Sequence, residues 1–410
     1  MSEVRILPST LSGRLSVPLS KSAAHRAVIC SALAGEEELL PPGETLSDDI
    51  IATQSAVAQL LSSHGEPVTL DCAESGSTLR FLIPLAAALG IPATFTGRGR
   101  LPERPIGVYL DCLPRHGVRC ETEGGLPLTI SGTLTPGVFS LPGNVSSQFI
   151  TGLLLALPLL GGTSEITLTS PLESAAYVDM TVQIMSSFGV SVERTETGWK
   201  IDGNRKYVPN PDFTIERDWS QAAFFLAAGM FGGPVELSGL NPTSCQGDRA
   251  AEELFRRMGA QIVWDNGILT AKPGKPEDSG FEINASQIPD LVPILAAAAA
   301  LLPGRQTVIT HAERLRLKES DRLSAMANGL NRLGANVREL PGGLEITGVE
   351  QLHGGKAEGC NDHRVVMALA VAALKSNGET VLTDAQSIRK SYPDFFRDYT
   401  RLGGKAYDMG

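Results

Sequence analysis

The sequence predicts an α/β protein built as two similar lobes, with buried helices inside and strands outside. Three observations predict this fold: a pattern that recurs six times along the 410 residues, helix candidates that are apolar on nearly every side, and a midpoint between the third and fourth copies. Dividing the length by the usual ~150 residues per domain gives roughly 2.7, which agrees with two or three domains.

The recurring pattern is an amphipathic stretch, then a glycine, then a short strand-like run. The six glycines are Gly65, Gly117, Gly189, Gly259, Gly334 and Gly403. Their successive numbers differ by 52, 72, 70, 75 and 69 residues. A glycine in the left-handed conformation commonly ends a helix, so we expect a helix to end at each copy. Three copies continue as predicted hairpins, with turns at 196–198, 265–267 and 342–343.

Helix candidates without a polar face predict the layering. They are Phe149–Leu160, Ala222–Phe231, Leu291–Leu302 and Val365–Leu374. Such helices must be buried, which places the half-exposed strands outside. Ordinary consecutive α/β units are the alternative, and they account for these helices less well. Three repeats in each half predict a first lobe over 14–213 and a second over 1–13 plus 214–410, with Pro209–Thr214 as a crossing segment.

Composition limits the classes of function. The formal net charge is −10 (35 Lys and Arg against 45 Asp and Glu), which disfavours general binding to nucleic acid. The longest strongly apolar run, Leu291–Pro303, is shorter than the roughly 20 residues of a membrane span, and no secretory signal follows Met1. The six scattered cysteines include no Cys-x-x-Cys pair, so we expect reduced thiols in the cytoplasm, with no membrane contact and no zinc.

Polar motifs at predicted helix starts indicate an anion site. In the first, Ser20-Lys21-Ser22 and Arg26 surround the start of a helix expected from about Ser22 to Ala34, with Ser22 as a natural capping residue. Similar polar segments at 74–80, 144–148, 318–322 and 361–364 open other helices. Free N–H groups and the helix dipole favour anions at such ends. For any one motif, a capped surface helix with a stray basic pair is the alternative.

Several acids and histidines have a plain structural interpretation as well. Asp290 precedes an apolar helix and would serve as its N-cap, and Glu319 would be an ordinary charge at a helix start. For Asp48 and Asp49, capping is favoured over a metal site. His25 and His363 lack metal-ligand spacing. The sequence also lacks the nucleotide-binding, nucleophile-elbow and zinc-protease motifs.

The ordered motifs together resemble the 5-enolpyruvylshikimate-3-phosphate synthases, a family of enolpyruvyl transferases. The matching segments are 20–26, 76–80, 103–107, 145–148, 174–179, 288–290, 318–322, 361–364 and 390–394. The resemblance runs from about residue 10 to 402. It implies a two-lobed inside-out α/β barrel, with three βαβαββ repeats per lobe and two crossing segments that act as a hinge. It also implies transfer of the enolpyruvyl group of phosphoenolpyruvate to the 5-hydroxyl of shikimate 3-phosphate, without a cofactor or metal.

The resemblance assigns candidate residues to both substrates. Those for shikimate 3-phosphate are Lys21, Ser22, Arg26, Ser146, Ser147, Gln148, Ser174, Tyr177, Asp290 and Lys318. Those for phosphoenolpyruvate are Lys21, Gly76, Arg104, Gln148, Arg322, Arg364 and Lys390. Multiply anionic substrates require such guanidinium and ammonium groups. We expect Asp290 to take the hydroxyl proton and Glu319 or Lys21 to supply a proton to the enol methylene.

Three positions depart from the family pattern and are left out of the site: Glu74, Arg217 and Arg314. Two other functions stay open. A sister enzyme that transfers the same group to UDP-N-acetylglucosamine usually has Lys-Asn where this chain has Lys21-Ser22, and a reactive cysteine on a loop where 97–105 has none. A non-enzymatic, nucleic-acid-associated protein of the same repeat fold is opposed by the net acidity. We expect a monomer that acts on small molecules.

Overall fold

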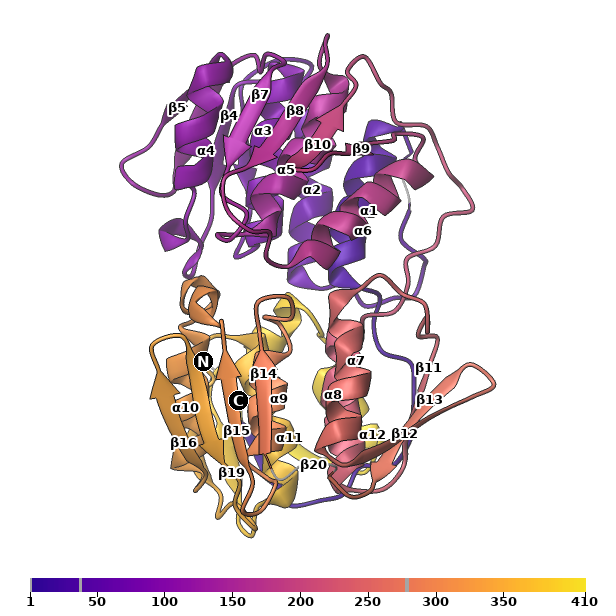
Figure 1. The fold of residues 1–410 in the computed structure, drawn as a ribbon, viewed down its shortest axis with the longest axis vertical. Coiled ribbons are helices and arrows are strands. Elements are labelled where there is room, and N and C mark those ends of the chain that lie inside the picture. The colour runs from indigo at the N-terminus through magenta and orange to yellow at the C-terminus, as the bar shows by residue number, and fades with distance from the viewer. Residues whose placement is uncertain (1, 37–38, 277–279) are drawn as a thin grey trace. The chain divides into compact units, whose positions relative to one another are not determined.

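The computed structural model describes residues 2–36, 39–276 and 280–410 (Figure 1). The chain divides into two compact units. We call Ser20–Ile215 the first lobe, and Met1–Leu19 with Glu216–Gly410 the second lobe. No helix in the described ranges combines the length and the apolar character needed to cross a membrane.

A βαβαββ unit recurs in both lobes, and the copy that ends the first lobe illustrates it. Its elements are β7 (Val138–Leu141), α5 (Ser147–Ala156), β8 (Ser164–Leu168), α6 (Ala175–Ser187), β9 (Glu193–Arg194) and β10 (Gly198–Ile201). The sheet order is β7-β8-β10-β9. The first pair is parallel and the other two pairs are antiparallel. This mixture follows from the connections, because helix α5 crosses over to a parallel strand whereas a short turn joins β9 to β10.

The first lobe contains a second copy of this unit and a helix pair. The copy is β3 (Val68–Asp71), α3 (Gly76–Leu89), β4 (Ala93–Thr96), α4 (Gly107–Cys112), β5 (Val118–Glu121) and β6 (Leu128–Gly132). The helix pair is α1 (Lys21–Leu33) and α2 (Asp48–Ser62). Within the described residues, no four-stranded sheet accompanies α1 and α2. In Figure 1, β7 and β8 are drawn in front of α3 and α5.

The second lobe contains three copies. The first is β2 (Gly13–Leu15), α7 (Trp219–Phe231), β11 (Val235–Ser238), α8 (Ala251–Met258), β12 (Ala260–Asp265) and β13 (Ile268–Pro273). The next is β14 (Gly280–Asn284), α9 (Val292–Ala299), β15 (Gln306–Thr310), α10 (Arg322–Arg332), β16 (Asn336–Leu340) and β17 (Gly343–Thr347). The last is β18 (Gly355–Ala357), α11 (His363–Ala372), β19 (Thr380–Leu382), α12 (Phe395–Arg401), β20 (Lys405–Asp408) and β1 (Val4–Leu7). The N-terminal strand β1 completes this sheet by pairing antiparallel with both β19 and β20.

The predicted fold class is confirmed, and so is its layering. Every residue of α9 is buried, and so is every residue of α11. These helices join α7 in one apolar core, as expected for helices without a polar face. Two of the helices are shorter than predicted: α9 begins at Val292 and ends at Ala299, and α5 ends at Ala156 before a short 3₁₀ turn, η3 (Leu157–Leu159). Helix α7 instead begins three residues before the predicted start, and α11 begins and ends two residues early.

The recurring glycines adopt the predicted conformation. All six have positive φ, from +80° at Gly189 to +115° at Gly259. The predicted hairpin turn between β12 and β13 has positive φ at both Asn266 and Gly267, the geometry of a type I′ turn. A Cβ atom causes strain at positive φ, so glycine is favoured there. This local preference is why glycines in the sequence predicted the helix ends and the tight turn.

The two segments that connect the lobes are paired with each other where they enter the second lobe. Leu19 and Arg217 form an antiparallel bridge. The amide of Asp218 donates to the carbonyl of Pro18 at 3.0 Å, and Nη1 of Arg217 donates to the carbonyl of Val17 at 3.1 Å. The hinge role predicted for these segments stays a prediction.

Candidate active site

Helices of the first lobe begin at the predicted polar motifs, and serines cap them. Helix α1 begins at Lys21, and the Oγ of Ser20 accepts a hydrogen bond from the amide of Ala23. The prediction of Ser22 as the cap was therefore wrong by two residues. Ser75 caps α3 and Ser146 caps α5 in the same way. Each cap uses one first-turn N–H group, and the others remain available to an anion.

Lys21 lies at the start of α1 and pairs with an acid of α2. Its Nζ lies 2.7 Å from Oδ2 of Asp49. Ser47, and neither Asp48 nor Asp49, caps α2. The capping role favoured for these two acids was therefore wrong. Asp49 orients the ammonium group of Lys21 and offsets its charge.

Arg26 is buried and ties α1 to two other helices. Its Nε donates to Oγ1 of Thr181 at 2.7 Å, and its Nη2 donates to Oγ1 of Thr151 at 3.3 Å and to the carbonyl of Tyr177 at 3.0 Å. Its Nη1 donates to the carbonyl of Ser22 at 2.5 Å. The structure thus brings together Arg26, Ser22 and Tyr177, which were predicted to bind the same substrate.

A second group in this lobe centres on Gln148, the second residue of α5. Its Nε2 donates to Oγ of Ser77 at 2.9 Å, and its Oε1 accepts from Nη1 of Arg80 at 2.6 Å. Arg80 also donates through Nε and Nη2 to the carbonyl of Pro105, at 3.3 and 2.9 Å. Arg80 therefore connects α3, α5 and the loop after Arg104. We did not predict Arg80 as a site residue, although it ends the Gly76–Arg80 motif.

Gly76 and Arg104 lie in direct contact. A Cβ atom built on Gly76 would come within 2.7 Å of Cζ and Nη1 of Arg104. Only a residue without a side chain permits this approach of the guanidinium to the start of α3. The two residues were predicted to bind one ligand, and the structure places them together.

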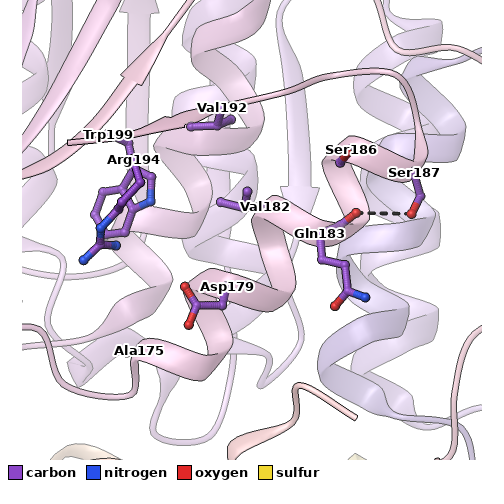
Figure 2. Close-up of a pocket in the computed structure, with 9 residues that line it drawn as sticks. All are labelled: Ala175, Asp179, Val182, Gln183, Ser186, Ser187, Val192, Arg194 and Trp199. Atoms are coloured by element: carbon purple, nitrogen blue, oxygen red, sulfur yellow. Dashed lines mark hydrogen bonds between the residues drawn. The ribbon is translucent and has the colours of Figure 1, made fainter. Parts of the chain in front are cut away.

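Ser174 and Tyr177 lie at the start of α6, beside a cavity that neither of them lines. Ser174 is buried and has φ of +55°. The cavity has a volume of about 630 Å³ and runs along α6 and β10, where Arg194 lies 4.2 Å over the ring of Trp199 (Figure 2). None of the predicted substrate-binding residues lines it. Ser147, also a predicted residue, is buried in the first turn of α5.

In the second lobe, Arg322 is the centre of a charged cluster. This guanidinium is 2% exposed, and it contacts three carboxylates. Nη1 lies 3.0 Å from Oδ1 of Asp290, Nη2 lies 2.6 Å from Oε2 of Glu319, and Nε lies 2.8 Å from Oδ2 of Asp362. Glu319 lies just before the start of α10, as expected, and its carboxylate pairs with the first residue of that helix. Asp362, which we did not predict, also caps α11 and accepts from Oγ of Ser320 at 3.0 Å.

Arg364 completes the cluster around Asp290. Its Nη2 lies 3.0 Å from Oδ2 of Asp290 and 3.0 Å from Oγ of Ser220, at the start of α7. Asp290 is not the N-cap of α9, because Leu291 occupies that position without a side-chain bond. The carboxylate thus faces two guanidinium groups instead of serving the helix.

The charge state of Asp290 follows from these neighbours. Burial disfavours the charged carboxylate, but Arg364, Lys318 and Arg322 outweigh burial, so the pKa of Asp290 lies well below its usual range. Glu319 acts in the opposite direction on this pKa. Asp290 is therefore ionised throughout the physiological pH range, and it can accept a proton.

Lys390 is the remaining predicted cation of this lobe. It ends η7 (Ala385–Lys390) and is buried, and its Nζ donates to the carbonyl of Asn361 at 2.6 Å. Asn361 lies immediately before Asp362, the cap of α11. Lys390 is thereby attached to the same helix start that carries Arg364.

The three departures from the family pattern have structural partners. The Glu74 carboxylate packs against Gly99, where a Cβ atom would clash with it. Arg314 donates through Nη2 to the carbonyl of Ser286 at 2.7 Å. Arg217 joins the pair of crossing segments described above.

The comparisons with known proteins are consistent over the whole chain. Residues 7–399 match the profile of EPSP synthase (3-phosphoshikimate 1-carboxyvinyltransferase). This chain belongs to the EPSP synthase family. The 3-phosphoshikimate 1-carboxyvinyltransferase of Clostridium novyi (strain NT) is 41% identical over 98% of each chain. That of Clostridium kluyveri is 43% identical over 99% of this chain and 98% of its own. The solved EPSP synthase from Acinetobacter baumannii is 25% identical, with a TM-score of 0.79 over 100% of both chains.

Membership of the EPSP synthase family makes this chain an enzyme of the transferase class. In the first lobe, Lys21 pairs with Asp49, Arg26 contacts α5 and α6, and Arg104 lies against Gly76. In the second lobe, Arg322 and Arg364 both contact the Asp290 carboxylate. Sequence reasoning missed Asp49 and Asp362, which pair with Lys21 and Arg322, and Arg80, which holds Gln148.

Proposed function

We propose that this chain transfers the enolpyruvyl group of phosphoenolpyruvate to the 5-hydroxyl of shikimate 3-phosphate, with release of phosphate, in the synthesis of aromatic amino acids. The observation that carries the proposal is the Asp290 carboxylate, which is ionised and in contact with Arg322 and Arg364. A base surrounded by guanidinium groups suits a reaction in which an alcohol adds to an anionic enol phosphate. Family membership supports the same reaction.

The cations divide between the two substrates as the family pattern implies. We propose that phosphoenolpyruvate binds to Lys21, Gly76, Arg104, Gln148, Arg322, Arg364 and Lys390. We propose that shikimate 3-phosphate binds to Lys21, Ser22, Arg26, Ser146, Ser147, Gln148, Ser174, Tyr177, Asp290 and Lys318. Planar guanidinium groups hold phosphate and carboxylate oxygens in pairs, which orients both ligands as well as binding them.

The reaction then proceeds by addition and elimination. Asp290 accepts the proton of the 5-hydroxyl while the oxygen bonds to C2 of phosphoenolpyruvate, and Glu319 or Lys21 supplies a proton to C3. In the second stage C3 loses a proton, the double bond returns, and the bond between C2 and the phosphate oxygen breaks. The nearby cations stabilise the departing phosphate. No bond to phosphorus changes, so the residues act only on carbon, oxygen and protons.

The charges around Asp290 explain why phosphoenolpyruvate should bind before Asp290 accepts a proton. In the unliganded protein Arg364 and Arg322 hold the pKa of Asp290 far below its usual range, which makes Asp290 a weak base. An anionic substrate on the same guanidinium groups offsets their charge and raises this pKa. The carboxylate therefore becomes a better base when phosphoenolpyruvate is bound.

A phosphate-release assay with two acceptors tests the function. The purified chain is mixed with phosphoenolpyruvate and either shikimate 3-phosphate or UDP-N-acetylglucosamine. Phosphate release with shikimate 3-phosphate supports the proposal. Release only with UDP-N-acetylglucosamine would identify the sister activity, and release with neither acceptor would favour a binding protein.

We further propose that the chain is a cytoplasmic monomer that binds no nucleic acid. The six cysteines are free thiols, which supports a reducing compartment. The net charge of −10 opposes binding to nucleic acid. Light scattering on the purified chain, with and without added RNA, tests both the mass and the binding.

A further inference from the structure

Arg316 makes an extensive set of polar contacts, although it lies outside the predicted substrate-binding set. It belongs to η5 (Glu313–Leu317), directly before the stretch that carries Lys318 and Glu319. The acceptors of its guanidinium are Oδ2 of Asp321 at 2.9 Å, Oε1 of Glu339 at 2.6 Å, and the carbonyls of Leu340 at 2.8 Å and Pro341 at 3.1 Å. One side chain thus joins η5 to the start of α10 and to the turn between β16 and β17.

The bond from Arg316 to Asp321 closes a short loop. It connects the residue before Leu317 to the residue after Ser320, so the four residues 317–320 are held at both ends. Asp321 is also the N-cap of α10 and accepts from the amide of Ser324 at 3.2 Å. Arg316 therefore holds the end of the loop at Asp321, the residue that also caps α10.

The loop contains two side chains that act on Asp290. Glu319 contacts Arg322 at 2.6 Å, and the same guanidinium contacts Asp290 at 3.0 Å. Lys318 is among the charges that lower the pKa of Asp290. Lys318 and Glu319 belong to this loop, so the path of its backbone decides where their charged groups lie.

We propose that Arg316 is a positioning residue for enolpyruvyl transfer, which keeps Lys318 and Glu319 in place beside Asp290. This inference rests on the proposed function. The hydrogen bonds of Arg316 involve none of the residues proposed to bind phosphoenolpyruvate, so its effect reaches the reaction through Lys318 and Glu319 of the loop. A displacement of about 1 Å in a catalytic group is enough to slow a reaction of this kind by roughly 100-fold.

The test compares Arg316→Ala with a matched control, Arg338→Ala, in the full-length chain. Arg338 lies on β16 of the same sheet, its side chain is 69% exposed, and it pairs with Glu345 on β17 instead of with a residue of the 317–320 loop. We expect Arg316→Ala to lower kcat for phosphate release about 10- to 100-fold, with little change in the KM for phosphoenolpyruvate. We expect Arg338→Ala to leave both constants as in the wild type.

The pH profile of kcat separates positioning from general weakening of the fold. Release of Lys318 from Asp290 removes a charge that lowers the pKa of this acid, so the acidic limb of the profile should move to higher pH in Arg316→Ala. Asp321→Ser keeps a capping oxygen but removes the carboxylate, so it should reproduce the loss in kcat even if Arg316→Ala does not fold.

The outcomes are distinct. A kcat of Arg316→Ala equal to that of Arg338→Ala, or an unchanged kcat in Asp321→Ser, would overturn the inference. A wild-type chain without transferase activity would instead contradict the proposed function. Lower kcat in both loop variants, with the shifted pH profile, would support the positioning role.

Discussion

Arg364 contacts Asp290 at two points: Nη2 lies 3.0 Å from Oδ2 of the side chain, and Nη1 lies 3.2 Å from the carbonyl oxygen of the same residue. The pair of bonds fixes both the backbone and the carboxylate of Asp290 against the first turn of α11. The other carboxylate oxygen, Oδ1, accepts a hydrogen bond from Nη1 of Arg322 at 3.0 Å.

Replacement of Asp290 should separate binding from turnover. We expect Asp290→Ala to leave the KM values for both substrates largely intact and to lower kcat about 100- to 10,000-fold, because the base is lost. Asp290→Asn keeps the shape and an acceptor for Arg322 but cannot take a proton, so it should be impaired as strongly. Steady-state phosphate release measures both variants. Near-normal kcat in either one would remove Asp290 from the role of base.

The lowered pKa of Asp290 predicts how stability depends on pH. The folded state keeps this carboxylate charged at a pH where the unfolded chain binds a proton. Its stabilising effect is therefore present above the ordinary carboxyl range, near pH ~4, and is lost as the pH falls through and below that range. Thermal unfolding of the wild type and Asp290→Asn from pH 7 to pH 3 measures the effect. The wild type should be more stable at pH 7, and the difference should shrink at low pH; a difference that does not change with pH would contradict this.

Substitution of Gly76 tests whether the close contact between Arg104 and the start of α3 matters for binding. A Cβ atom at Gly76 would lie 2.7 Å from the guanidinium of Arg104, so Gly76→Ala should displace Arg104 and raise the KM for phosphoenolpyruvate about tenfold, the equivalent of ~1.4 kcal/mol. Gly107→Ala is the control, because a Cβ there meets no atom within 4 Å. Equal KM values in the two variants would show that Arg104 does not bind this substrate.

The cysteines should differ in reactivity according to burial. Burial raises the pKa of the Cys30 and Cys72 thiols, and it raises that of Cys112 to about 11. We expect iodoacetamide at pH 8 to leave Cys30 and Cys72 unmodified in the native protein and to modify both in denaturant. Mass spectrometry of tryptic peptides measures this. Native labelling of Cys30 would contradict its place in the first-lobe core.

The sequence by itself determined the repeat, the glycines that follow helices and the identity of most charged groups. These features depend on local chemistry: a glycine at positive φ, a serine or aspartate that caps a helix, and apolar residues on every side of a helix. The glycines at 189 and 259 and the motif that begins α1 could therefore be recognised within a few residues of sequence.

Only the tertiary structure decided which side chains meet. Asp49 reaches Lys21 across 28 residues of sequence, and Asp362 reaches Arg322 across 40. Strand β1 joins β19 and β20 from the opposite end of the chain. Such contacts form when separate helices and strands pack around one core. The local periodicity of the sequence does not identify which distant residue will be the partner. For the same reason, Asp290 is a carboxylate held by two arginines and not a helix cap.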